Sequence, residues 1–166
     1  GASAQIATAS QAQSMPPNLA PQVQKLADLL SDRFAQAYPE ATMVQTIPLG
    51  AGENIMLVVL TVEGFSGGNN YTQYLAVFKP EAGEKQATHY QLIDTLPVAG
   101  KSWRTIEHLQ AHAYRHPKTG DLDLDITAQR VPAGDTSNAQ TTTIHLLLHN
   151  GRLFEKSAAS PARTKN

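Results

Sequence analysis

The segment 108–125 is rich in side chains that could bind a metal ion or transfer protons. Its histidines lie four residues apart and its aspartates two residues apart: His108, His112, His116, Asp121, Asp123 and Asp125. Imidazole nitrogens and carboxylate oxygens are ligands of zinc and copper, and imidazole also exchanges protons near neutral pH. The pattern therefore indicates a metal site, an acid/base site, or a β-hairpin with one solvated face.

A hairpin that turns at "PKTG" explains the alternation by half-burial alone. In the predicted register His116 lies opposite Asp121, His112 opposite Asp125, and His108 opposite Gln129, so the histidines and aspartates share one face. The opposite face is apolar and is expected to join the core: Leu109, Ala111, Ala113, Leu122, Leu124, Ile126 and Ala128. The favoured interpretation is therefore solvated cross-strand pairing of histidines with aspartates.

The competing hypothesis is a zinc or copper site formed by His108, His112, Asp125 and His145. Residues four apart are separated by about 13 Å along a strand but by about 6 Å along a helix, so a strand cannot bring all three hairpin histidines to one ion. The stretch "TIEHLQAHAYRH" contains good helix formers, and segment 103–116 stays open between the two. A strand is favoured because segment 121–131 alternates so regularly.

A second pair of histidines occurs near the end of the chain. His145 and His149 would share one face of a strand, while Ile144, Leu146 and Leu148 form the other. If this strand adjoins the hairpin, five histidines would border one polar surface. Such a surface would change its charge between about pH 5 and pH 8.

Several other chemistries are excluded by particular residues. The chain has no cysteine, so disulfides, thiolate metal sites and cysteine nucleophiles are absent. "DLDLDI" fails as a calcium-binding EF-hand loop, since Ile126 and Pro132 stand where glycine and glutamate are needed. Gly100–Ser102 resembles the end of a phosphate-binding loop, but Thr95 replaces its first glycine. No serine-hydrolase elbow or zinc-protease motif is present, and the sequence favours a non-catalytic protein.

The elements that would position these side chains are one helix followed by strands. Residues 21–37 have apolar positions at three- and four-residue steps, which predicts an amphipathic helix. After Pro39 the period changes to two. The predicted strands are 43–48, 54–62, 71–79, 86–95, 103–116, 121–131, 141–149 and 152–155, and Asn150–Gly151 is typical of a type I′ turn.

This order of elements predicts an α+β fold, in which the N-terminal amphipathic helix packs on a curved antiparallel meander of seven or eight strands. Cystatin-like and NTF2-like folds have a similar architecture, and an all-β, propeller-blade-like fold is the alternative. Residues 1–17 are expected to be a flexible leader, 18–155 a single domain, and 156–166 a flexible tail, because both ends contain few large apolar side chains.

Composition narrows the classes of function. Thirteen Lys and Arg residues nearly balance fourteen Asp and Glu residues and are scattered, which argues against a nucleic-acid partner. The apolar run 55–62 is too short for a transmembrane helix. The Ala/Ser/Gln-rich opening is typical of a chain cleaved by signal peptidase, so we expect a periplasmic or secreted protein. The favoured function is a non-catalytic binding or accessory domain for a protein, peptide or small ligand. The alternative is a metal-binding protein or metal-dependent hydrolase that uses the His/Asp face.

Overall fold

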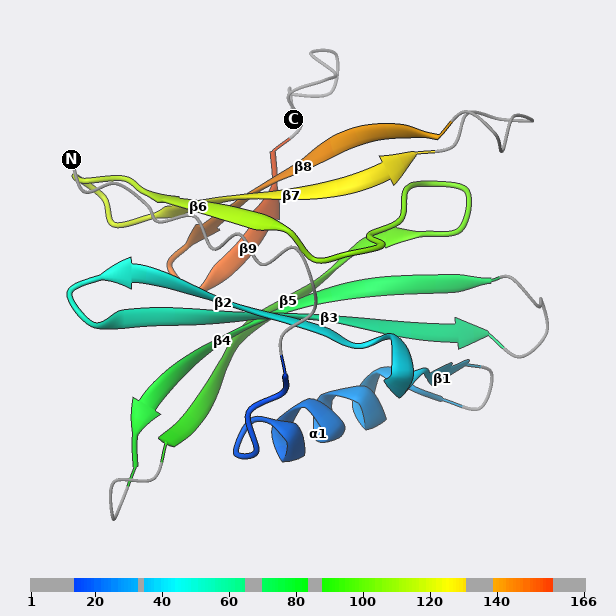
Figure 1. The fold of residues 1–166 in the computed structure, drawn as a ribbon, viewed down its shortest axis with the longest axis horizontal. Helices are drawn as coiled ribbons and strands as arrows, with labels where there is room; N and C mark the ends of the chain where they lie inside the picture. The colour runs from blue at the N-terminus through cyan, green and yellow to red at the C-terminus, as the bar shows by residue number, and fades with distance from the viewer. Residues whose placement is uncertain (1–13, 33–34, 65–69, 84–87, 131–138, 157–166) are drawn as a thin grey trace.

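The computed structural model describes residues 14–32, 35–64, 70–83, 88–130 and 139–156. Within these ranges the chain forms one α-helix, α1 (Ala20–Leu30), one 3-10 turn, η1 (Pro39–Ala41), and two antiparallel sheets (Figure 1). The strands are β1 (Ala35–Ala37), β2 (Met43–Gly50), β3 (Glu53–Gly64), β4 (Tyr71–Ala82), β5 (Thr88–Gly100), β6 (Ala111–Arg115), β7 (Leu122–Arg130), β8 (Gln140–His149) and β9 (Arg152–Glu155). No helix in the described ranges is long and apolar enough to cross a membrane.

The strands follow one another as a meander that is divided between two sheets. In sheet B the order is β1-β3-β4-β5. Strand β2 also pairs with β3, along residues 53–59, whereas β1 pairs with residues 62–64 at the end of β3. In sheet A the order is β6-β7-β8-β9. The predicted α+β architecture with one helix on an antiparallel meander is confirmed. The division into two sheets, with α1 on the far side of sheet B from sheet A, emerges only in three dimensions (Figure 1).

Strand β3 is the centre of the molecule because both of its faces are buried. Ile55, Leu57 and Val59 point into the core between the two sheets, whereas the intervening Met56 and Val58 point into a second core beneath α1. A strand that is covered on both faces needs no polar alternation. This arrangement accounts for the continuous apolar run in segment 55–62.

The predicted helix 21–37 is wrong at its C-terminal end, because α1 stops at Leu30. Ser31 is extended, and its hydroxyl donates a hydrogen bond to the Ala27 carbonyl at 2.7 Å and accepts one from the Ala37 N–H at 3.0 Å. Serine hydroxyls often compete in this way with helical backbone bonds. Ala35–Ala37 instead forms β1, which pairs with the end of β3.

The predicted strand 103–116 is confirmed only for Ala111–Arg115. Thr105, rather than His108, lies opposite Gln129, so residues 106–109 leave the ladder and that part of the predicted register is wrong. The cause is burial, since Ile106 and Leu109, three residues apart, both enter the core. A flat strand would send these two side chains to opposite faces. The ladder resumes at Gln110, whose carbonyl accepts a hydrogen bond from the Thr127 N–H at 3.1 Å.

Two buried glutamines fix this irregular segment to sheet B. The side-chain amide of Gln73 donates to the Ile106 carbonyl at 2.9 Å and accepts from the Ile106 N–H at 2.8 Å. Gln45 forms the same two-way pair with Ala111, at 3.1 and 3.0 Å. The two amides therefore satisfy buried backbone groups at the two ends of the irregular segment.

Candidate functional site: the outer face of sheet A

The outer face of sheet A, which points away from sheet B, displays three rows of side chains that cross the strands. The rows follow from the observed register: His116, Asp121, His149 and Arg152; Tyr114, Asp123, Leu147 and Phe154; and His112, Asp125 and His145. The alternate residues of β7 and its neighbours are buried in the core between the sheets. The prediction that half-burial places the aspartates and histidines on one face is therefore confirmed for the three aspartates and for the histidines at positions 112, 116, 145 and 149, but it is wrong for His108.

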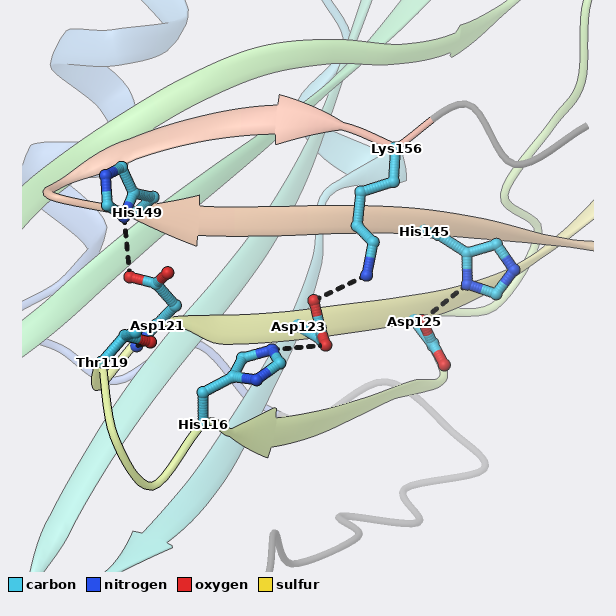
Figure 2. Close-up of polar contacts among 8 residues, drawn as sticks. All are labelled: His116, Thr119, Asp121, Asp123, Asp125, His145, His149 and Lys156. Atoms are coloured by element: carbon cyan, nitrogen blue, oxygen red, sulfur yellow. Dashed lines mark hydrogen bonds and ion pairs between the residues drawn. The ribbon is translucent and has the colours of Figure 1, made fainter. Parts of the chain in front are cut away.

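Each aspartate on β7 and its preceding turn lies within hydrogen-bonding distance of a histidine (Figure 2). The separations are 2.8 Å for His145 Nδ1 and Asp125 Oδ1, for His149 Nδ1 and Asp121 Oδ1, and for His116 Nε2 and Asp123 Oδ2. A central column of carboxylates is thus flanked by imidazoles from both neighbouring strands.

The side-chain pairs differ in two places from the backbone register. His112 is the Cα partner of Asp125, but the Asp125 carboxylate contacts His145 on the other neighbouring strand. The His116 side chain contacts Asp123, which lies diagonally across the ladder, and Asp121 contacts His149 instead. The Thr119 hydroxyl accepts a hydrogen bond from the Asp121 N–H at 3.2 Å and so fixes the start of the aspartate column.

Asp123 is the most strongly tethered carboxylate of the face. Its second oxygen lies 2.9 Å from Lys156 Nζ, so it is held by a cation and an imidazole together (Figure 2). Partial burial raises the pKa of Asp123, but the hydrogen bonds from Lys156 and His116 outweigh it and lower the pKa below its usual value. The backbone N–H of Lys156 also donates a hydrogen bond to the His145 carbonyl at 2.8 Å.

The four residues of the predicted metal site are only partly brought together. Asp125 and His145 are in contact, and His112 is adjacent to Asp125 across the β6–β7 ladder. His108 instead lies on segment 106–109, which has left the ladder, and it lines a separate hollow beside η1. Within the described ranges, no group of three or more histidine, aspartate or glutamate side chains is arranged to hold a metal ion.

Sequence reasoning missed the apolar side chains that flank Asp123 in the middle row, which together with Tyr114 form what we call the aromatic row. Tyr114 is 52% exposed and Phe154 is 46% exposed, and Leu147 lies between their strands in the same row. The signal was present in the alternation, because Tyr114 follows buried Ala113 and Phe154 follows buried Leu153. Leu147 and Phe154 are direct cross-strand neighbours, and Tyr114 lies on the other side of Asp123. Exposed apolar side chains that gather on one face typically mark interaction surfaces.

The charge of the three rows depends on the histidines. Three aspartates against Arg152 and Lys156 leave one net negative charge when the four histidines are neutral. Full protonation of the histidines changes this to three net positive charges.

The arrangement is suited to recognition, since it combines exposed aromatic side chains with oriented polar groups. Comparisons of the chain with protein-family models, with curated proteins and with solved structures found no match.

Proposed function

We propose that this chain is a non-catalytic binding domain that is exported to the periplasm or secreted, and that it binds a protein partner through the outer face of sheet A. The observation that carries the proposal is the middle row, in which Tyr114 on one side of Asp123 and Leu147 and Phe154 on the other stay accessible, while sheet B is covered by α1. Covering these apolar side chains with a partner would remove their surface from water, which is favourable in proportion to the area buried.

The composition of the face supports a protein partner. Specific protein interfaces combine a centre rich in aromatic side chains with a polar rim, and tyrosine is enriched at their most important positions. Here the aromatic row lies between two rows of histidines and aspartates. The aspartate column between imidazoles and cations offers charges of both signs, which complements a mixed polypeptide surface better than a polyanion such as nucleic acid.

The polar rows are also held in place before binding. Each of Asp121, Asp123 and Asp125 is oriented by a histidine at 2.8 Å, so these side chains lose little further freedom when a partner arrives. Ordering side chains at an interface otherwise costs roughly 0.5–1.5 kcal/mol for each long side chain. Preorganisation of the rim therefore favours specific binding.

Export is supported by the small-residue composition of the opening segment. It is tested by fractionating cells that express the complete gene product with a C-terminal epitope tag. Recovery in the periplasmic fraction or the medium supports export, and recovery with cytoplasmic markers contradicts it.

The binding surface is tested by site-specific photocrosslinking in the native host. A photoreactive phenylalanine analogue is placed at Tyr114 or at Phe154, and at two matched control positions on other elements, Tyr38 and Leu92, which are similarly exposed. We expect one crosslinked protein from both face positions and none from the controls. The partner is then purified, and we expect Phe154→Ser to weaken its binding at least tenfold.

Two results would contradict the proposal. Equal crosslinking from the control positions would show that contact does not depend on this face. Unchanged affinity of Phe154→Ser for the purified partner would show that the apolar row contributes nothing. Crosslinks between two copies of the chain would show that the face binds a second copy of this chain instead of another protein.

The metal-binding alternative is supported by the contact of Asp125 with His145 and by the adjacent His112. A zinc or copper site would need these groups to turn toward one ion and would need a further ligand, since three protein ligands are usual even in catalytic zinc sites. It is addressed by the metal titration described in the Discussion.

A further inference from the structure

A second candidate site, away from the aromatic row, lies at one open end of the two-sheet core. Three tight turns meet there: the β2–β3 turn, the β6–β7 turn and the β8–β9 turn, with β4 and β5 alongside. They enclose a pocket of about 310 Å³. Pockets for small ligands usually have volumes of about 300–1,000 Å³, so this one suits a small molecule.

The floor of the pocket is apolar. Ile55 and Leu122 belong to the buried core, and Leu49, Ile93 and Leu148 are partly buried against it. The core between the sheets therefore comes to the surface at this point. An apolar group that covered these side chains would remove them from water, which favours binding in proportion to the area covered.

The rim of the pocket is charged and joins the two sheets. Arg115 at the end of β6 forms an ion pair with Glu53 at the start of β3, with Nη2 and Oε1 2.7 Å apart. The hydrogen bond from Arg115 lowers the pKa of Glu53, and the positive charge of Lys79 lowers it slightly further. Glu53 is therefore ionised and balanced by Arg115, and Lys79 on β4 adds a second cation to the same side of the rim.

On the other side of the rim, Asp121 is bonded to His149. The two carboxylates of the rim are thus engaged with side chains of the protein, and Lys79 adds a cation to the pocket beside the Arg115–Glu53 pair. We propose that this pocket binds a small amphipathic monoanion, whose apolar body covers Leu49, Ile93 and Leu148 and whose anionic group lies between Lys79 and Arg115. Asp121 and His149 border both this pocket and the outer face of sheet A, but the inference does not depend on the proposed protein partner.

The proposal is tested by titrating the whole ¹⁵N-labelled chain with decanoate below its micelle concentration, and with 1-decanol and decyltrimethylammonium at equal concentrations. We expect decanoate to shift the amide signals of the three turns and to bind more tightly than the neutral and cationic compounds. Shifts spread over the surface, or none in these turns, would overturn the proposal.

Variants separate the charged contact from the apolar one. We expect Lys79→Gln to weaken decanoate binding about twofold to fivefold, as for a partly exposed ion pair, and the matched exposed-lysine control Lys25→Gln on α1 to leave it unchanged. Leu49→Trp should fill the pocket and prevent binding of all three compounds, while a wild-type-like spectrum elsewhere shows that it folds. Equal affinities of decanoate and 1-decanol, together with an unaffected Lys79→Gln variant, would refute the preference for an anion.

Discussion

Replacement of Gln73 by leucine is the sharpest test of how the two sheets are held together. Gln73 is 4% exposed, and its amide satisfies both the N–H and the carbonyl of Ile106, which belongs to the irregular segment between the sheets. Leucine has a similar volume but can form neither bond. The substitution therefore leaves two buried backbone groups without their partner.

The expected loss follows from these two groups. An unsatisfied buried donor or acceptor costs about 1–3 kcal/mol, and leucine recovers part of this because it has no amide to desolvate. We expect the free energy of unfolding to fall by about 2–5 kcal/mol from a total that is typically about 5–15 kcal/mol. The matched control is Gln91→Leu at an exposed position of β5, which should change the free energy of unfolding by no more than about 0.5 kcal/mol.

The assay is urea unfolding followed by the fluorescence of Trp103, the single tryptophan of the chain, and by far-ultraviolet circular dichroism. A change of less than about 1 kcal/mol in Gln73→Leu would refute the reasoning, because two unsatisfied buried groups cannot cost so little. Gln73→Glu adds a check of the sign. A buried glutamate has a raised pKa, so this variant should lose stability as the pH rises and approach the wild type as its carboxyl group is protonated.

Three further predictions concern sheet A. The lowered pKa of Asp123 gives stability that is present above the usual value of 3.8 and is lost as the pH falls through the folded-state pKa, so Asp123→Asn should flatten the fall in urea midpoint below about pH 4. Asn150 has a positive φ of 52° in the β8–β9 turn, so Asn150→Ala should lower the melting temperature by the equivalent of about 1 kcal/mol, whereas Asn150→Gly should not. After chelator treatment, Zn²⁺ should change the melting temperatures of the wild type and of His112→Asn equally, because no three candidate ligands lie together in the described residues. A rise in the wild type that His112→Asn abolishes would favour the metal hypothesis.

The sequence by itself determined the features that depend on near neighbours. Alternation in segment 121–131 was enough to predict β7, its buried leucines and its outward aspartates. Asn150–Gly151 was enough to predict the last turn, because both residues adopt the positive φ that a type I′ turn needs. The pairing of His112 with Asp125 followed from the length of the connecting turn. All of these features are fixed by the two-residue period of a strand and by local backbone conformation.

Only the tertiary structure decided the features that depend on distant partners. The helix ends at Leu30 because residues 35–37 pair with a strand that begins at Glu53. His108 leaves the histidine face because Ile106 and Leu109 both enter the core and because Gln73 supplies the backbone bonds that a ladder would have supplied. Asp125 faces His145 rather than His112 because it has a strand on each side, and the backbone register does not select between them. Burial and hydrogen bonding between segments far apart in the chain carry no local pattern, so the sequence could place the His/Asp face but could not say which of its side chains meet.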